Sequence, residues 1–172
     1  MSYIAWMDSG KLPREQVGGK GAALSELSAA GFRVPVGFCV TADGYRHYAD
    51  ATGLNLKIMT ILSTIDSSQP ATTRAAAEQI CGLLKETHLP PELRGAIEEA
   101  YTTLMAKQDM ACAVRSSAIS EDGSAASFAG LYETYLNIRG VDDILSKVHE
   151  CYVSLWAERA VGYRARSAHR DT

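Results

Sequence analysis

Four consecutive residues near the N-terminus, Gly18, Gly19, Lys20 and Gly21, have the composition of a phosphate-binding turn. They open a stretch rich in helix-forming residues, and the amides at the start of a helix attract anions. Glycines allow a ligand to approach the backbone closely, and the lysine adds a positive charge. The spacing differs from a Walker A loop, because Lys20 is followed by glycine and no strand is predicted before it. A second interpretation stays open, in which the glycines form a flexible helix cap and the lysine is solvated.

An arginine followed by two hydroxyls forms a second candidate site, at Arg115, Ser116 and Ser117. The arginine follows an apolar run that is typical of a short buried strand, so its guanidinium is expected at the strand end. A guanidinium can hold phosphate oxygens in a fixed fork geometry, and the neighbouring hydroxyls can add contacts. Pairing of the arginine with Glu121 or Asp122 is the alternative.

A third candidate is the stretch 124–134, in which small residues precede a predicted strand. Gly130 and Thr134 both belong to it. Such a loop can fold over a nucleotide, and it can equally be a connection without a binding role.

Composition and charge argue against several classes of protein. Among 172 residues, 17 Lys and Arg stand against 20 Asp and Glu, and the net charge of −3 does not favour nucleic-acid binding. No apolar run approaches the roughly 18 residues of a membrane span, and the first residues lack the pattern of a secretory leader. Cys39, Cys81, Cys112 and Cys151 form no close pair and the histidines are scattered, so no metal site is predicted. The sequence predicts a cytoplasmic protein without nucleic-acid or membrane partners.

Hydrophobic periodicity and capping residues predict the elements that must position these candidates. Helices are expected over 19–30, 41–51 and 54–66, around 76–84 and 91–104, and from about 141 onward. Strands are expected over 36–40, 111–115 and 132–138. In the last strand Tyr135 and Asn137 are expected to alternate with Leu136 and Ile138, and the helices around 76–84 and 91–104 are expected to form a hairpin. The predicted fold class is α/β (α+β), mostly helical with a small mixed sheet.

The three candidates occur in a fixed order together with other short motifs. The motifs are Val17-Gly-Gly-Lys-Gly-Ala-Ala-Leu, Val34-Pro-Val-Gly-Phe, Val114-Arg-Ser-Ser-Ala, Ser127-Phe-Ala-Gly, Thr134-Tyr-Leu-Asn, and Glu158-Arg-Ala followed by Tyr163-Arg. In this order they resemble the N-terminal nucleotide-binding domain of the phosphoenolpyruvate synthase and pyruvate phosphate dikinase family, which also includes rifampin phosphotransferase. The resemblance runs from about Gln16 to Arg164.

The resemblance implies an ATP-grasp-like fold in which ATP lies between two subdomains. Carried over to this sequence, it implies that Lys20 and Arg115 bind the phosphates of ATP. It also implies that Gly130 and Thr134 belong to the loop and strand that close over the nucleotide. Accessory contacts are expected from Gly19, Ser116 and Ser117. Mg²⁺ is expected to be brought with ATP, and no metal ligand or catalytic residue is assigned within this chain.

Some features depart from the family pattern. The residues after Ser120-Glu121-Asp122 lack the proline usual there, and Leu131-Tyr132 replaces a glutamine-containing pair. The resemblance places the metal-binding carboxylate in a second ATP subdomain, a phosphorylated histidine in a swivelling domain, and acceptor binding in a third domain. None of the four histidines here has the Gly, Thr and Ser neighbours of that phosphorylated histidine. Residues 1–172 are therefore expected to be the N-terminal part of the ATP-binding domain, without those further domains and inactive alone.

The expected function is the ATP-binding portion of a dikinase-type phosphotransferase. By resemblance, ATP yields AMP and phosphate while a phosphoryl group passes through a histidine to an acceptor, and pyruvate giving phosphoenolpyruvate is the first expectation. The expected partners are ATP and the remaining domains of the enzyme or a second chain, a homodimer included. Two alternatives stay open: part of a rifampin or other antibiotic phosphotransferase, and a non-catalytic stand-alone module or split-enzyme subunit that binds a nucleotide or a partner.

Overall fold

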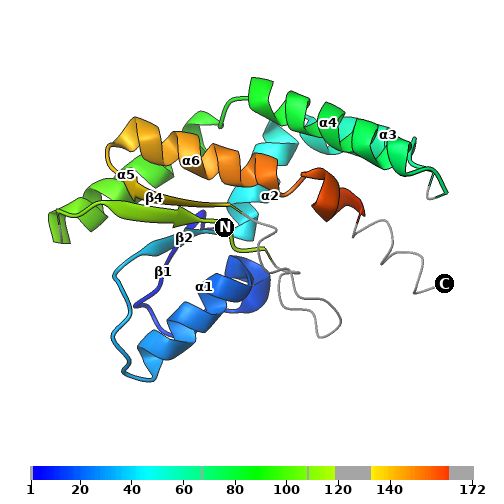
Figure 1. The fold of residues 1–172 in the computed structure, drawn as a ribbon. Helices are drawn as coiled ribbons and strands as arrows, with labels where there is room; N and C mark the ends of the chain where they lie inside the picture. Colours follow the sequence, from blue (N-terminus) through cyan, green and yellow to red (C-terminus); the bar gives the residue numbers. More distant parts are fainter. Residues whose placement is uncertain (1, 67, 108, 119–132, 163–172) are drawn as a thin grey trace.

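A computed structural model describes residues 2–66, 68–107, 109–118 and 133–162 of the chain (Figure 1). The helices are α1 (Arg14–Ala29), α2 (Ala42–Ala51), α3 (Leu54–Leu62), α4 (Pro70–Glu86), α5 (Pro91–Lys107) and α6 (Val141–Ser154). The strands are β1 (Ile4–Trp6), β2 (Phe38–Val40), β3 (Cys112–Arg115) and β4 (Thr134–Ile138). Helices predominate, which confirms the predicted mostly helical α+β class. Within the described ranges, no helix combines the length and apolarity that crossing a membrane requires.

The strands form two separate antiparallel pairs. β1 pairs with β2, with Ile4 opposite Val40, and β3 pairs with β4, with Arg115 opposite Thr134. The prediction of one small mixed sheet is therefore wrong. The pattern within a segment indicates a strand but does not name its partner, which here is 19 or more residues away. β1 escapes prediction altogether, because its three residues are too few to show an alternating pattern.

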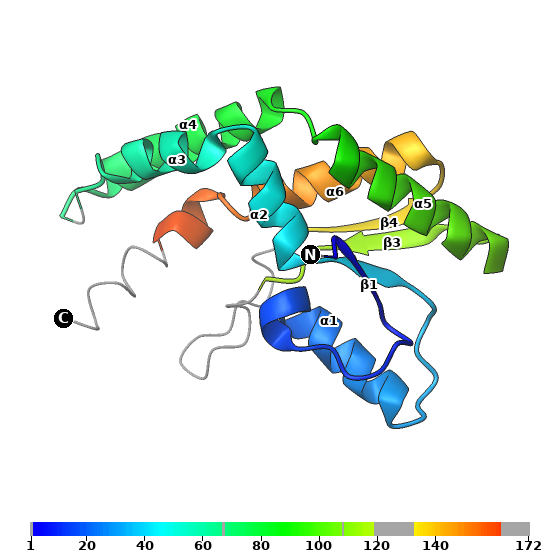
Figure 2. The same cartoon turned by 180° about the vertical axis from the view of Figure 1, so that it is seen from behind.

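The hydrophobic core lies among helices α2 to α6. Its buried members include Tyr48, Leu54, Ile58, Ile80, Leu84, Leu93, Ile97, Tyr101, Ile144, Leu145, Val148 and Tyr152. On α5 the predicted apolar face is confirmed, because its residues Leu93, Ile97, Ala100, Tyr101 and Leu104 are all buried. The predicted hairpin of α4 and α5 is wrong. Helix α6 packs against both α4 and α5, so these two helices bury their apolar faces mainly against α6 and make few contacts with each other (Figures 1 and 2).

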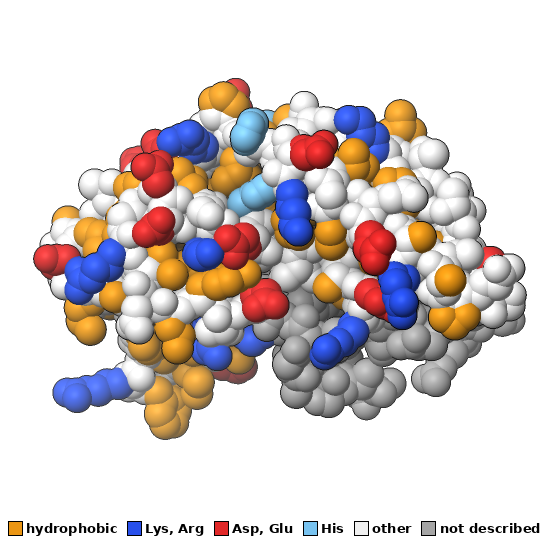
Figure 3. Space-filling view, turned by 45° about the horizontal axis from the view of Figure 1, so that its top comes forward, with side chains coloured by type: hydrophobic (Ala, Val, Ile, Leu, Met, Phe, Trp, Pro, Cys, Tyr) orange, Lys and Arg blue, Asp and Glu red, His pale blue; other side chains and the backbone are white. Residues whose placement is uncertain are grey.

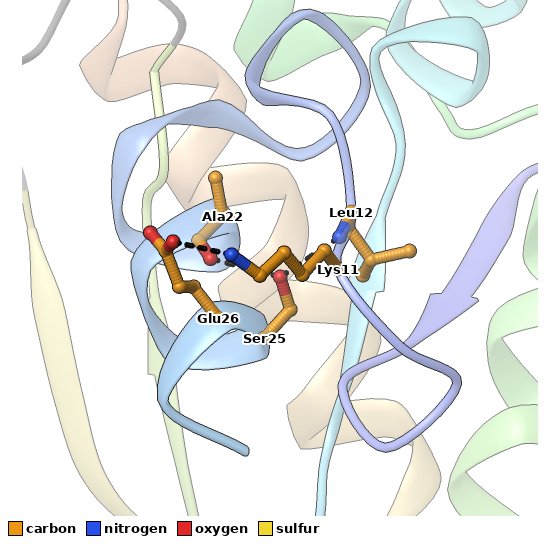
Figure 4. A network of polar contacts seen from close by, with 5 residues as sticks. All are labelled: Lys11, Leu12, Ala22, Ser25 and Glu26. Carbon is orange, nitrogen blue, oxygen red and sulfur yellow. Dashed lines mark hydrogen bonds and ion pairs between the residues drawn. The ribbon is translucent and has the colours of Figure 1, made fainter. Parts of the chain in front are cut away.

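Helix α1 lies with β1 and β2 on the opposite side of the β3–β4 pair from α6 (Figure 1). A polar network fastens the segment before α1 to the helix (Figure 4). The fully buried Ser25 hydroxyl accepts a hydrogen bond from the Leu12 amide at 3.0 Å and donates one to the Ala22 carbonyl at 2.8 Å. On the surface, Lys11 Nζ lies 2.7 Å from Glu26 Oε1, and its hydrogen bond and charge lower the pKa of the Glu26 carboxyl. These contacts fix α1 relative to the chain that leaves β1.

Strand β4 contains a bulge, so its side chains do not alternate as predicted. Cys112 lies opposite Ile138 and Val114 lies opposite Tyr135, so β4 uses one residue more than β3 over this span. Asn137 takes a left-handed conformation with φ of 59°. Because an extra residue reverses the side-chain alternation beyond it, Tyr135 and Ile138 are the half-buried residues of the strand. The expected alternation of Tyr135 and Asn137 against Ile138 is wrong for this reason.

The ends of the helices follow the predicted capping residues. The Thr41 hydroxyl accepts a hydrogen bond from the Gly44 amide at 3.3 Å and caps α2. Gly53, between α2 and α3, adopts a left-handed φ of 67°. Helix α3 is shorter than predicted and ends at Leu62, because the amides of Thr64 and Ile65 bond to carbonyls three residues back and tighten the last turn.

Candidate functional site

The predicted glycine-rich start of a helix takes the form of a break within α1. The backbone leaves the helical conformation at Gly18, where φ is 72° and ψ is 177°, so Gly19, Lys20 and Gly21 form the first turn of a second helical segment. Residues with a side chain disfavour this φ. The Gly18 backbone also lies against Ser117, and a Cβ at position 18 would stand 2.0 Å from the Ser117 carbonyl oxygen. Both observations explain why a glycine occupies the break.

The segment that follows β3 is joined directly to this break. The Ser117 hydroxyl donates a hydrogen bond to the Val17 carbonyl at 2.7 Å, across 100 residues of sequence. The same hydroxyl accepts one from the Gly21 amide at 3.0 Å. The Gly19 amide donates to the Ala118 carbonyl at 3.2 Å. Two motifs that the sequence presents separately are therefore in contact.

These contacts revise the anion site expected at the start of the helix. The Gly19 and Gly21 amides, expected to face an anion, donate instead to Ala118 and to the Ser117 hydroxyl. In this motif the half-buried Lys20 remains as the predicted phosphate contact. Sequence reasoning missed the role of Gly18, although a pair of adjacent glycines at positions 18 and 19 is a signal for a backbone break.

Arg115 ends β3 beside Thr134, the first residue of β4. The two residues face each other in the strand register, Arg115 is exposed, and its Nε donates toward Thr134 Oγ1 at 3.5 Å. Ser116 is buried, with 6% of its surface exposed, and its amide donates to the Glu133 carbonyl at 3.3 Å. Its hydroxyl has no hydrogen-bond partner among the described residues. The structure thus brings Arg115, Ser116 and Thr134 together.

Electrostatics relate Lys20 to the same region. Burial raises the pKa of the Cys151 thiol on α6 to about 12. The carboxylates of Glu150 and Glu133 act in the same direction, and the positive charge of Lys20 acts in the opposite one. The charges of Lys20 and Glu133 therefore both act on the Cys151 thiol, in opposite directions.

Several predicted residues lie outside the described part of the chain. Gly130 falls there, as do Glu121 and Asp122, the carboxylates considered as partners of Arg115. Among the residues that the structure describes, no group of three or more His, Cys, Asp and Glu side chains gathers in a way that could hold a metal ion. The side chains at the break and at the end of β3 include an ammonium, a guanidinium and hydroxyls, which are groups that suit an anion.

A cavity of about 210 Å³ lies elsewhere in the fold, and Figure 3 shows a face on which histidine side chains lie among charged ones. Its lining residues are His88, Leu89, Arg94, Leu145, Ser146 and His149, none of which is a predicted ATP contact. His149 Nε2 lies 3.3 Å from the buried Tyr48 hydroxyl, and His47 stacks on Tyr3 with ring centroids 5.0 Å apart. These two histidines have structural contacts.

Comparison with known proteins shows the family of the chain. Residues 14–172 match the family model described as pyruvate phosphate dikinase, AMP/ATP-binding domain. The chain is 44% identical over 170 residues to a probable phosphoenolpyruvate synthase of Methanocaldococcus jannaschii, with 95% of this chain and 14% of that protein covered. It is 43% identical over 166 residues to the phosphoenolpyruvate synthase of Aeropyrum pernix, covering 94% of this chain and 20% of that one.

A bacterial relative gives the same result. The phosphoenolpyruvate synthase of Escherichia coli is 41% identical over 160 residues, which cover 90% of this chain and 20% of that protein. The chain thus spans between about a seventh and a fifth of the length of these three relatives. Because the family model covers nearly the whole chain, the protein belongs to the pyruvate phosphate dikinase AMP/ATP-binding domain family.

Proposed function

We propose that the region between the α1 break and the end of β3 binds the phosphates of ATP, with Lys20 and Arg115 as the charged contacts. The observation that carries this proposal is the junction of Gly18 with Ser117, which unites the lysine and arginine motifs in one place. Membership of an AMP/ATP-binding domain family supports it independently. An ATP-grasp-like arrangement, with the nucleotide between this part and a second subdomain, belongs to the same proposal.

Each side chain would make a distinct contribution. Phosphoryl transfer depends mainly on positioning and on neutralising negative charge, which an ammonium and a guanidinium provide. The Ser116 hydroxyl has a proton with no described acceptor, so it can donate to a phosphate oxygen. Thr134 Oγ1, beside Arg115, would orient the guanidinium, and Gly130 would belong to the segment over the nucleotide. Mg²⁺ would accompany the phosphates of ATP.

We propose the acceptor of the phosphoryl group from the names of the relatives, because the described residues offer no acceptor site of their own to argue from. The three relatives are named phosphoenolpyruvate synthases, which supports pyruvate as the acceptor in a dikinase-type reaction. In that reaction ATP gives AMP and phosphate, and the phosphoryl group reaches the acceptor through a histidine. We place that histidine and acceptor binding in other domains or another chain. Phosphate binding by Lys20 and Arg115 would be the same for a rifampin-type acceptor.

Phosphate binding is tested by titrating the 172-residue chain with MgATP. The backbone amide chemical shifts are followed by nuclear magnetic resonance. A site with one half of its contacts is expected to bind weakly, with a millimolar dissociation constant. The shifts are expected to concentrate at residues 19–21, 115–117 and 134. Lys20→Ala and Arg115→Ala should each weaken binding about tenfold, since each removes a charge-assisted contact.

The matched controls are Lys57→Ala and Arg33→Ala, which remove the same charges from exposed positions outside this region. They should leave the affinity for MgATP unchanged. Equal losses in the controls, or shifts that avoid residues 19–21 and 115–117, would refute the proposed phosphate site.

A further inference from the structure

We infer that Ser117 is a positioning residue, whose hydroxyl fixes Lys20 relative to Arg115 instead of touching the nucleotide. The inference rests on the proposed function and assigns a different role to each of two adjacent serines. Ser116 and Ser117 were both expected as accessory ATP contacts on the basis of resemblance. Their hydrogen bonds differ: the Ser117 hydroxyl bonds within the protein, whereas the Ser116 hydroxyl has no partner among the described residues.

The hydrogen-bond inventory of Ser117 excludes it as a phosphate donor. A serine hydroxyl has one proton, and in Ser117 that proton goes to the Val17 carbonyl at 2.7 Å. The remaining contact, from the Gly21 amide at 3.0 Å, uses a lone pair. A fully ionised phosphate oxygen accepts hydrogen bonds and needs a donor, which this hydroxyl no longer offers.

The same hydroxyl bridges both sides of Lys20. Val17 stands three residues before the lysine and Gly21 directly after it, so Ser117 holds the turn that carries the lysine at both ends. On its own side Ser117 stands two residues after Arg115. The Ser117 hydroxyl therefore links the turn that carries Lys20 to the segment that follows Arg115.

Backbone contacts make the junction specific. The Gly19 amide donates to the Ala118 carbonyl at 3.2 Å, next to the hydroxyl bridge. A Cβ on Gly18 would lie 2.0 Å from the Ser117 carbonyl oxygen and 2.6 Å from its hydroxyl oxygen. Any side chain at position 18 would force the two segments apart. We call this set of contacts, formed by residues 17–19 and 21 with Ser117 and Ala118, the serine clip.

The test compares Ser117→Ala with the wild-type chain in titrations with MgATP and with adenosine. Adenosine lacks phosphates, so a residue that only positions phosphate contacts should not affect its binding. We expect Ser117→Ala to weaken MgATP binding about tenfold and to leave adenosine binding unchanged. Hydrogen exchange at the Gly21 amide should accelerate in the same variant, because its acceptor is removed. Ser63→Ala, which removes a hydroxyl bonded to the Thr60 carbonyl, is the matched control and should change neither affinity.

Each other outcome decides against the inference. Equal loss of MgATP and adenosine binding would show a merely structural role. Fast exchange at Gly21 with unchanged MgATP affinity would show that the clip can open without moving the phosphate contacts. If Ser117→Ala does not fold, Ser117→Thr keeps the donor and acceptor and should retain the wild-type ratio of the two affinities; a changed ratio with Gly21 still protected would overturn the inference. Failure of the proposed function itself is recognised separately, because Lys20→Ala and Arg115→Ala would then leave MgATP binding unchanged.

Discussion

At the scale of single residues, the hydrogen bonds of their hydroxyls distinguish Ser117 from Ser116. Ser117 uses its proton within the protein, whereas the hydroxyl of Ser116 finds no acceptor among the described residues. An unpartnered buried hydroxyl costs stability. The same comparison applies to two tyrosines of the core. Tyr48 bonds through its hydroxyl, while the buried Tyr152 hydroxyl has no partner among the described residues.

The tyrosine pair gives a prediction about stability. Tyr152→Phe removes a hydroxyl that is buried without a partner and keeps the ring stacked on Tyr48, so the free energy of unfolding should stay the same or rise by about 1 kcal/mol. Tyr48→Phe removes the donor to the Thr87 carbonyl at 3.1 Å and the contact with His149, and it should lower the free energy of unfolding by about 1–2 kcal/mol. Urea denaturation measures both. Equal destabilisation by the two variants would contradict this interpretation.

At the scale of elements, the β3–β4 pair presents the arginine of the candidate site. The pair lies against α6 on one side, and its open end joins the serine clip on the other. The bulge in β4 turns Tyr135 inward, where Lys147 of α6 lies 4.8 Å from the centre of its ring. Thr134 then stays on the exposed side, opposite Arg115. The bulge therefore determines which β4 side chain meets the arginine.

The left-handed residue of the bulge gives a prediction at this scale. Asn137→Gly should leave the free energy of unfolding within about 0.5 kcal/mol of wild type, because glycine adopts φ of 59° without strain. Asn137→Val should lower it by about 2 kcal/mol, since a β-branched residue strains in this conformation. The control is Leu136→Val, at an exposed neighbour in the same strand, which should be nearly neutral. Thermal denaturation gives the comparison, and an Asn137→Val variant as stable as wild type would argue against the bulge.

The elements that the sequence predicts well are those with local signals. The five apolar positions of α5 repeat at helical spacing, and Thr41 caps α2 through a hydrogen bond three residues along. The features that escape prediction depend on distant contacts: the pairing of β1, the position of α6 between α4 and α5, and the serine clip. For the candidate site, sequence alone indicated Lys20 and Arg115 as phosphate contacts. The sequence could not assign roles to Ser116 and Ser117, because these roles depend on which of the two hydroxyls bonds to the break in α1.

At the scale of the whole molecule, the candidate site joins α1 to the segment that follows β3. Helices α2 to α6 share the hydrophobic core and carry the β3–β4 pair. Helix α1 lies with β1 and β2 on the other side of that pair (Figure 2). The lysine comes from α1 and the arginine from the end of β3, so their relative position depends on the contacts between these two segments.

The measurement that tests the account most directly is a crystal structure of the chain with Mg²⁺ and a non-hydrolysable ATP analogue. The account predicts phosphate oxygens within hydrogen-bonding distance of both Lys20 Nζ and the Arg115 guanidinium, with the Ser117 hydroxyl still bonded to the Val17 carbonyl. Phosphates bound to neither Lys20 nor Arg115 would contradict it.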